Sequence, residues 1–303
     1  MLMHRMPALA VSAGTTLHAA QGTWPDVDGG QEFHAIGCEF RANAPLRYQE
    51  VRCANFGSGT IHCRGMRSAL ENPQLPRSFD VRDRLQSREI LDDWEPPAEV
   101  LRRSYRELDR LHRWLGNRAA VLRELRRLGV GRHNRVLDVG CGQGALLEAI
   151  RRRFRCEVVG ADLRGGCATS TVPIVQADAV RDALPKADVA VCVVMAHHLD
   201  PAELQAMIQN IARSCGALIL LDLVRHPVPL ILFRMCVAPL LSRINAMDGE
   251  TSVRRAYTPQ ELRQIVQAAL PGCPHAALAV RYRVAPLWLR QTVVVEWQKT
   301  RNG

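Results

Sequence analysis

Short apolar runs alternate with longer amphipathic stretches between residues 135 and 223, and this rhythm constrains the fold more than any other feature. The pattern predicts strands at 135–139, 156–162, 172–178, 187–195 and 217–223, with helices at 145–154 and 200–214. Nearly continuous apolar runs are typical of strands that are buried on both faces of a sheet. Strands that alternate with helices therefore predict a parallel, doubly wound α/β domain.

The C-terminal part of the chain continues this pattern after one interruption. Residues 224–256 are mixed in character and mostly helical, so we expect a helical insertion there. The stretch 258–270 starts with Thr258 and Pro259, and Glu261 follows; this order favours a capped helix start. Two further apolar runs, 276–284 and 291–299, predict a closing pair of strands.

The N-terminal part differs in character from the rest. Residues 67–120 contain apolar positions at helical spacing, which predicts a helical cap in front of a domain that spans 121–303. Residues 1–66 have no sustained period and mix Gly, Ser, Thr, His and Cys. We expect them to be a disordered extension, or an upstream reading frame misassigned to a protein that starts at Met66.

Composition limits the classes of partner and compartment. Arginine and lysine exceed the acids by ten, but only Lys186 and Lys299 are lysines. The base composition of the coding DNA is therefore an alternative to nucleic-acid binding as the explanation of the arginine excess. Ten scattered cysteines without a framework indicate a reducing, cytoplasmic location. The sequence contains no uninterrupted apolar run of transmembrane length, so no membrane span is predicted. The oligomeric state stays open.

The first predicted strand runs into a glycine-rich loop, "RVLDVGCGQG" at 135–144. Glycines allow positive φ and close approach of a ligand to the backbone. A dinucleotide site favours G-x-G-x-x-G around a pyrophosphate, whereas the spacing here is one residue shorter. Asp138 directly before the loop suits a ligand with a positive ammonium group better than a phosphate.

The segment 136–144 resembles motif I of the class I S-adenosylmethionine (SAM)-dependent methyltransferases, "[VIL]-L-D-[VI]-G-C-G-x-G". The resemblance extends over about 120–300. It implies a Rossmann-like, doubly wound sheet of seven strands with an antiparallel last strand, and SAM as cofactor. The residues that it assigns to cofactor binding are Asp138, Gly140, Cys141, Gly142, Gly144, Asp162, Leu163, Asp178, Ala179 and Met195. In the family, the acid at Asp162 bonds the ribose hydroxyls and the acid at Asp178 receives the adenine amino group.

The segment "VVMAHHLDPAEL" at 193–204 is similar to the small-molecule, quinone-biosynthesis C-methyltransferase branch of this family. This similarity places His197 and His198 near the transferred methyl group. Either histidine could be a general base, or could only pack against the turn. Tyr257 is a further catalytic candidate. We expect no metal, because adjacent side chains point apart and the sequence offers no evident carboxylate partner.

These patterns favour a methyltransferase that acts on a small, partly apolar acceptor such as a phenol, quinol or polyketide-like secondary metabolite. The acceptor pocket is expected to include Tyr105, Arg113, Trp114, Asp248, Arg254 and Arg255. A nucleic-acid partner is not expected, because "MAHH" replaces the "[DNS]-P-P-[YF]" motif of base-amino methyltransferases. Two alternatives stay open: an RNA or protein methyltransferase that uses the arginine-rich helices, and a SAM-binding protein without catalysis.

Overall fold

The computed structural model describes residues 79–93, 97–165 and 171–298, together with four short strands nearer the N-terminus. By its internal contacts the chain divides into two units, Met1–Gly65 and Met66–Gly303.

The first unit contains two antiparallel strand pairs. These pairs are β1 (Thr23–Trp24) with β2 (Phe33–His34), and β3 (Cys38–Phe40) with β4 (Val51–Cys53). The rest of the predicted extension 1–66 lies outside the described residues. Its disorder or misassignment therefore stays a prediction.

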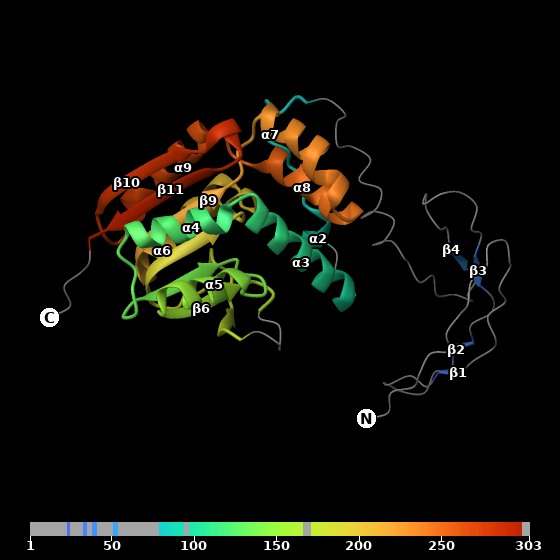
Figure 1. Ribbon diagram of the computed structural model, residues 1–303, viewed down its shortest axis with the longest axis horizontal. Helices are drawn as coiled ribbons and strands as arrows, with labels where there is room; N and C mark the ends of the chain where they lie inside the picture. The colour runs from blue at the N-terminus through green and yellow to red at the C-terminus, as the bar shows by residue number, and fades with distance from the viewer. Residues whose placement is uncertain are drawn as a thin grey trace. The chain divides into compact units, whose positions relative to one another are not determined.

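A seven-stranded sheet forms the centre of the second unit (Figure 1). Its strands in chain order are β5 (Arg135–Val139), β6 (Glu157–Asp162), β7 (Ile174–Gln176), β8 (Ala187–Val193), β9 (Cys215–Asp222), β10 (Ala277–Val284) and β11 (Gln291–Trp297). The spatial order is β10-β11-β9-β8-β5-β6-β7. The first five strands are parallel, and β11 runs antiparallel to both β9 and β10. This topology confirms the predicted seven-stranded sheet with an antiparallel last strand.

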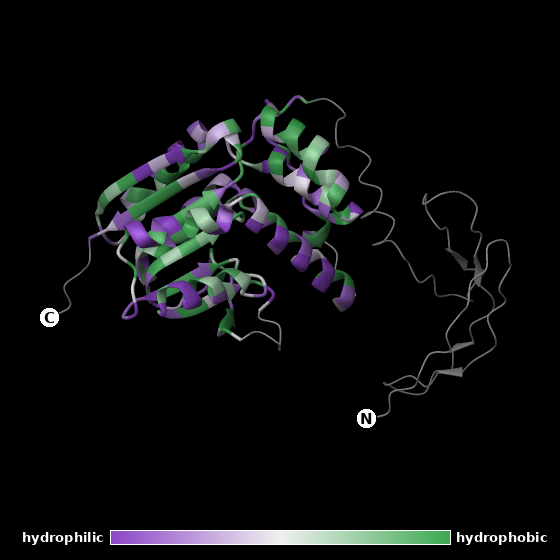
Figure 2. Cartoon of the chain, in the orientation of Figure 1, coloured by the Kyte–Doolittle hydropathy of each residue, from purple (hydrophilic) through white to green (hydrophobic). Residues whose placement is uncertain are grey.

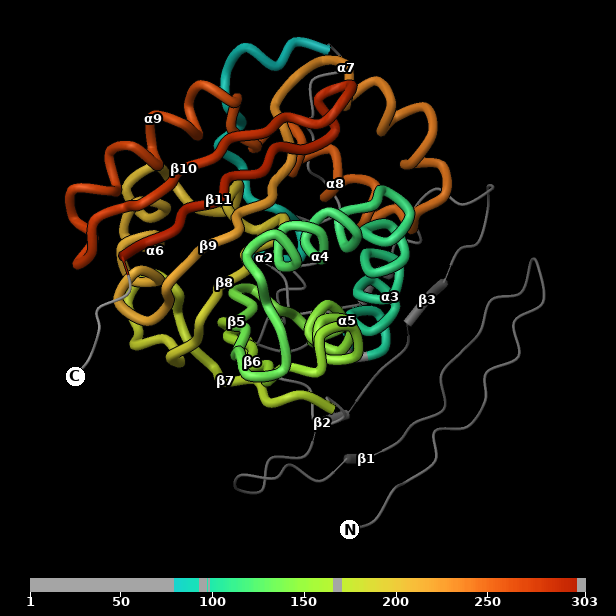
Figure 3. Tube along the Cα trace, turned by 60° about the vertical axis from the view of Figure 1, so that its left-hand side comes forward, coloured from blue at the N-terminus to red at the C-terminus, as the bar shows by residue number. Residues whose placement is uncertain are grey.

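Two helices cover each face of the sheet (Figure 3). Helices α4 (Asn117–Arg127) and α5 (Ala145–Phe154) pack on one face, and α6 (Pro201–Ser214) and α9 (Pro259–Ala269) pack on the other. Successive side chains of a strand point to opposite faces. In β8, for example, Val191 joins the core under α4 and α5, whereas Cys192 joins the core under α6 and α9. Figure 2 accordingly shows apolar residues concentrated in the central strands.

The predicted helix starts are confirmed at two positions. Asp200 accepts a hydrogen bond from the Glu203 backbone at 2.8 Å, and the Glu203 carboxylate accepts one from the Asp200 backbone at 3.0 Å. Thr258 and Glu261 form the same reciprocal pair at the start of α9. Each pair satisfies two backbone N–H groups that a helix start leaves free. The predicted strand 172–178 is shorter than expected, because β7 contains only Ile174–Gln176 at the edge of the sheet.

Helices before and within the α/β domain pack together at one end of the sheet. They are α2 (Ile90–Asp93), α3 (Ala98–Trp114), α7 (Pro227–Leu232), a π-helical turn η2 (Phe233–Val237), a 3₁₀ turn η3 (Ala238–Leu240) and α8 (Arg243–Arg255). Helix α8 contacts α2 and α3. Asn245 of α8 donates a hydrogen bond to the Glu107 carboxylate of α3 at 2.8 Å. The N-terminal helices and the insertion therefore form one helical layer, visible beside the sheet in Figure 1.

The segment 79–93 is fixed to this layer by arginines. Arg84 donates hydrogen bonds to the carbonyls of His197 and Leu199, both at 2.8 Å. Arg225, buried after β9, donates to the carbonyls of Val81 and Arg82. We call residues 79–93 the strap, because bonds to the turn after β8 and to α8 hold it in place. No helix within the described residues is long and apolar enough to cross a membrane.

Candidate active site

The predicted cofactor residues meet at the carboxyl ends of four neighbouring strands. Strands β8, β5, β6 and β7 lie side by side in this order, and all are parallel. Asp138 is on β5, Asp162 ends β6, Asp178 follows β7 and Met195 follows β8. Ligands of open α/β sheets bind at this edge, where the strand order reverses. The structure therefore brings together residues that are up to about sixty positions apart in sequence.

The glycine loop depends on backbone conformations that side chains disfavour. Gly140, Gly142 and Gly144 have φ values of 73°, 53° and 80°. A Cβ at Gly140 would lie 2.9 Å from Met195 Cγ, and a Cβ at Gly142 would lie 3.4 Å from Tyr105 Cε1. The loop is therefore a narrow backbone cradle between β8 and α3, as a closely held ligand requires.

Carboxylates line the inner side of this cradle. Asp162 accepts a hydrogen bond from the Gly142 backbone at 2.8 Å and one from the Arg164 backbone at 3.0 Å. Asp138 is buried, and burial together with the negative Asp162 raises its pKa to about 8. A buried carboxyl group without a cation nearby favours its neutral form. A ligand that carries positive charge would stabilise the ionised form, so the site fits the ammonium and sulfonium groups of SAM.

The outer end of the cradle is more open. Leu163 is 67% exposed, and Asp178 caps its own turn by accepting a hydrogen bond from the Val180 backbone at 2.9 Å. The Ala179 carbonyl accepts a hydrogen bond from Asn210 of α6, which fixes this turn to the domain. An exposed leucine beside a fixed polar turn suits a flat apolar group with a polar edge, such as adenine.

Cys141 packs beneath the loop against β6. A Cβ at Gly160 of β6 would lie only 2.4 Å from the Cys141 sulfur, so β6 needs a glycine opposite the loop. Burial raises the pKa of the Cys141 thiol, which keeps it neutral. Cys141 thus acts as a packing residue, and its backbone is the part that faces the cradle.

A second group of polar side chains lies where β8 ends. Val194 turns the chain with a φ of 53°, a strained value for a β-branched residue, and leads into the 3₁₀ turn η1 (Ala196–His198). His197 is 1% exposed. Its Nδ1 lies 2.8 Å from Asp222 Oδ1, and its backbone N–H donates to Asp222 Oδ2 at 2.8 Å. Asp222 at the end of β9 therefore fixes both the position and the ring orientation of His197.

Glu89 of the strap faces both histidines. Its Oε1 lies 3.3 Å from His197 Nε2 and 3.7 Å from His198 Nε2, and it accepts a hydrogen bond from Ser252 of α8 at 2.6 Å. Burial opposes the charge of His197, but Asp222 and Glu89 outweigh burial and raise its pKa to about 10. Burial would raise the pKa of Glu89, but His198 and His197 outweigh it and lower the pKa.

His198 is the more accessible of the two histidines. Its side chain is 27% exposed, and its Nδ1 lies 2.9 Å from the Asp92 carboxylate. Arg255 of α8 lies 3.5 Å from the same carboxylate. We name Glu89, Asp92, His197, His198 and Asp222 the histidine cluster.

One premise of the sequence argument is wrong. The adjacent rings of His197 and His198 do not point apart: their centroids are 4.3 Å apart, and both rings face Glu89. Glu89 and Asp92 are the carboxylate partners that the sequence analysis did not find. Asp222 gave a usable signal, because it ends the strand next to β8 at the ligand edge. Glu89 gave no such signal, since only tertiary packing of the strap brings it there.

Comparison with known proteins agrees with this geometry. The family model described as "Methyltransferase domain" matches residues 103–269. The chain belongs to this family. With the glycine loop and the strand order, it is a class I SAM-dependent methyltransferase, and SAM is its cofactor. The predictions of family, fold and cofactor are confirmed.

Two solved structures are similar to this chain at low sequence identity. The plantazolicin methyltransferase BpumL, in complex with a monoazolic desmethylPZN analog and SAH, has a TM-score of 0.50 and 12% identity, covering 67% of this chain and 91% of that chain. The magnesium protoporphyrin IX methyltransferase ChlM from Synechocystis PCC 6803, with bound SAH, has a TM-score of 0.42 and 15% identity, covering 61% and 83%. Among curated proteins, no match to this sequence is found.

Several residues expected around the acceptor of this methyltransferase are either exposed or occupied by structural contacts. The Tyr257 hydroxyl donates a hydrogen bond to the Leu199 carbonyl at 2.7 Å, and burial raises its pKa to about 12. Trp114 is 64% exposed, and Arg113 pairs with Asp109 on the outer side of α3. Asp248 accepts hydrogen bonds from the backbone of Ile90 and Leu91, so it caps α2. The structure therefore shows no free catalytic group among Tyr257, Arg113, Trp114 and Asp248.

The remaining residues of the expected pocket divide between the two sites. Tyr105 lies against the glycine loop, as described above. Arg255 borders the histidine cluster and donates a hydrogen bond to the His198 carbonyl at 2.8 Å. Arg254 is buried and binds Glu250 and the Asp80 carbonyl, so it holds the strap in place.

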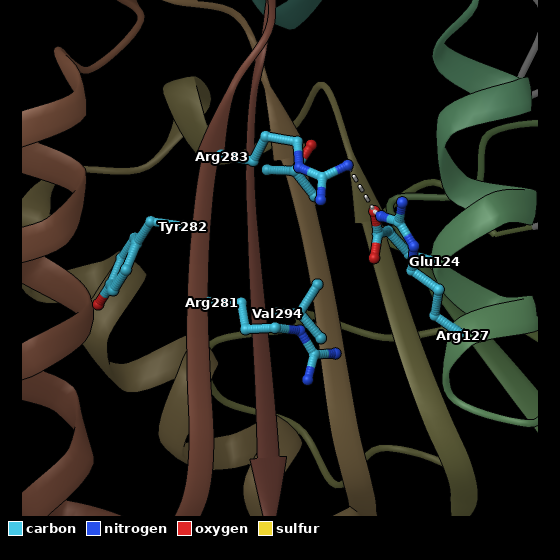
Figure 4. Close-up of a pocket in the computed structure, with 7 residues that line it drawn as sticks. Glu124, Arg127, Arg281, Tyr282, Arg283 and Val294 are labelled. Carbon is cyan, nitrogen blue, oxygen red and sulfur yellow. Dashed lines mark hydrogen bonds and ion pairs between the residues drawn. The ribbon is translucent and has the colours of Figure 1, made fainter.

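A separate cavity of about 520 Å³ lies between α4 and the β10–β11 hairpin (Figure 4). Three arginines line it, but each has an acidic partner. Arg127 and Arg283 lie 2.5 and 3.8 Å from Glu124, and Arg281 lies 2.5 Å from Glu296. None of the predicted cofactor or catalytic residues lines this cavity. It is therefore separate from the predicted methyl-transfer site, and its paired arginines do not support a nucleic-acid surface.

Proposed function

We propose that this methyltransferase acts on a small, partly apolar acceptor that carries a hydroxyl group, such as a phenol, a quinol or a polyketide-like metabolite. One observation carries the proposal: α8 packs against both α2 and η1, so helices cover the histidine pair. A site enclosed by packed helices suits a small molecule better than a nucleic acid, which needs a broad positive surface.

The proposed cofactor residues fit the parts of SAM. The glycine loop and Asp138 would hold the methionyl end, and Asp162 the ribose hydroxyls, because one carboxylate can accept two hydrogen bonds. Asp178, Ala179 and Leu163 would hold the adenine. When bound, SAM supplies a methyl group that its positive sulfur makes electrophilic.

The chain itself has to align the acceptor, exclude water and remove a proton. His198 is the best group for proton removal. Its Nδ1 is held by Asp92 at 2.9 Å, which leaves Nε2 to accept the acceptor proton. His197 is too deeply buried to reach an acceptor, so it is a positioning residue. Met195 precedes the pair and borders Gly140, which connects the histidine cluster with the cofactor loop.

The proposal is tested with SAM and a panel of phenols and quinols, followed by mass spectrometry of acceptor products and of S-adenosylhomocysteine (SAH). We expect acceptor-dependent SAH formation and a product heavier by one methylene unit. His198→Ala should lower kcat by about 10²- to 10⁴-fold, the usual contribution of a general base, while SAH affinity is unchanged. His133→Ala, at an exposed position after α4, is the matched control.

Two results would reject parts of the proposal. If SAH binds but no acceptor of this kind is methylated, the acceptor class is wrong. If an RNA or a protein is methylated instead, and RNA binding weakens steeply with salt, the arginine-rich alternative replaces it. Exposed arginines of α3 give that alternative little support, because Arg103 and Arg113 are already paired with acids of their own helix.

A further inference from the structure

Three metal-ligating atoms converge within the histidine cluster. His197 Nε2, His198 Nε2 and a Glu89 carboxylate oxygen all lie within 4.8 Å of one another. The two nitrogen-to-Oε1 distances are 3.3 and 3.7 Å. Atoms bound tetrahedrally to one zinc ion at about 2.1 Å lie about 3.4 Å apart, so the observed spacing is close to that of a metal site.

The orientation of the rings favours a metal as well. The Nδ1 atom of each histidine faces a carboxylate, Asp222 for His197 and Asp92 for His198. An Nδ1–H that donates to a carboxylate leaves a lone pair on Nε2. Metal-binding histidines usually make such a bond with their other ring nitrogen, and it fixes the orientation of the ring. When both rings are neutral, the two lone pairs face Glu89 Oε1, which also accepts a hydrogen bond from the Ser252 hydroxyl.

One of these atoms is unpartnered in a buried place. His197 Nε2 has no hydrogen-bond partner among the described residues, although the residue is only 1% exposed. Burying such an atom without a partner is costly, so it needs either a proton directed at Glu89 Oε1, 3.3 Å away, or a metal ion. Protons on both histidines would place two cations in rings whose centroids are 4.3 Å apart, whereas a single metal ion satisfies all three atoms.

We propose that Glu89, His197 and His198 bind one divalent transition-metal ion. Two imidazoles with one carboxylate suit zinc, iron or cobalt, whereas magnesium and calcium favour all-oxygen sites. The partly exposed side chains of His198 and Asp92 give the ion a route from solvent. Three protein ligands leave a further position for an oxygen ligand. A metal and a proton compete for the Nε2 lone pair of His198, so metal binding and the proton transfer proposed above exclude each other at this atom.

The test measures metal binding directly. Tag-free full-length protein is stripped with a chelator and titrated with Zn²⁺ by calorimetry, with Mg²⁺ as a comparison. We expect one Zn²⁺ per chain and no comparable Mg²⁺ binding. Co²⁺ in place of Zn²⁺ should give the visible absorption of a site with nitrogen ligands. Absence of saturable Zn²⁺ binding, or an unchanged Co²⁺ spectrum, would overturn the proposal.

Variants assign the ion to these residues. His198→Ala and Glu89→Gln should each remove Zn²⁺ binding. Asp92→Asn should weaken it by about 10- to 100-fold, the usual effect of losing a second-shell partner. His133→Ala should bind as the unaltered chain does. Equal binding by His198→Ala and the unaltered chain would reject the site. SAH calorimetry on the same samples reports folding and cofactor binding, so failure of the metal proposal is distinguishable from failure of the methyltransferase proposal.

Discussion

The cofactor loop and the histidine cluster lie at the same edge of the sheet but are built in different ways. The loop is one continuous segment, Gly140 to Gly144, shaped by backbone conformation and by the absence of side chains. The histidine cluster contains side chains from the strap, η1 and the end of β9, so its members are far apart in sequence. The shape of the loop depends on the absence of side chains, whereas the arrangement of the histidine cluster depends on pairs of carboxylates and histidines.

This difference determines how each region should respond to substitution. Added volume in the loop should change cofactor affinity, because it occupies the cradle. Loss of a partner in the cluster should change stability, because the groups left behind are buried and polar. Five measurements test this contrast.

The largest effect is expected for Asp222→Ala. It removes the acceptor for His197 Nδ1 and for two backbone N–H groups, those of His197 and Leu223. Breaking a buried pair usually costs about 3–5 kcal/mol, so unfolding in urea should shift strongly. Asp200→Ala, at an exposed helix cap, should cost about 1 kcal/mol. An equal loss in the two variants would contradict the importance of buried pairing.

Gly160→Ala should have an intermediate effect. The new methyl group would lie 2.4 Å from the Cys141 sulfur and 3.0 Å from Leu147 Cδ1. Overpacking of this kind costs about 1–3 kcal/mol of the free energy of unfolding, and it should also displace the loop. Gly131→Ala is the control, because no atom lies within 4 Å of its added Cβ. If both variants are equally stable, Cys141 can move away without cost.

Gly140→Ala should weaken SAH binding by about tenfold, which corresponds to about 1.4 kcal/mol. The added Cβ would lie 2.9 Å from Met195 Cγ. Gly129→Ala shares the positive φ, 74° against 73°, but its Cβ has no neighbour within 4 Å. The pair therefore separates steric contact from backbone strain. Calorimetry that finds equal SAH affinity for both variants would show that Met195 does not shape the cradle.

The smallest effect is expected from pH, through Asp138. Its pKa is raised to about 8 in the cofactor-free fold, so below pH 8 a positive ligand must displace a proton. SAH affinity should rise by about fivefold from pH 7 to 8, and then level off above the pKa of Asp138. Asp138→Asn should remove this rise, and a persistent rise in that variant would assign it to another group.

The same group gives a stability prediction with a defined sign. Between pH 4 and 8 the folded chain holds a proton on Asp138 that the unfolded chain has released, so the free energy of unfolding falls as pH rises through this window. Asp138→Asn should flatten that part of the stability profile, measured by urea unfolding without cofactor.

The sequence predicted the regions that depend on local patterns. The strands β5 and β8 and the capped helices α6 and α9 follow directly from apolar periodicity and from capping residues. The acids predicted to bind the cofactor lie at one edge of the sheet, as expected from their positions at or near strand ends, and their role stays a prediction. Glu89 and Asp92 were not found, because the strap has no strong period and is held beside the histidines by tertiary contacts, among them those of Arg84, Arg225 and α8. Tyr257 was expected to be catalytic, but its hydroxyl is occupied by a backbone carbonyl.

The position of the strap has a consequence for how this enzyme can change. The family match begins at residue 103, whereas Glu89 and Asp92 precede it. Two of the five residues of the histidine cluster therefore come from a short stretch outside the matched part of the chain. The match also ends at residue 269, before β10 and β11, so the matched part alone lacks two strands of the sheet. Substitutions in the strap can alter the surroundings of both histidines without touching the glycine loop.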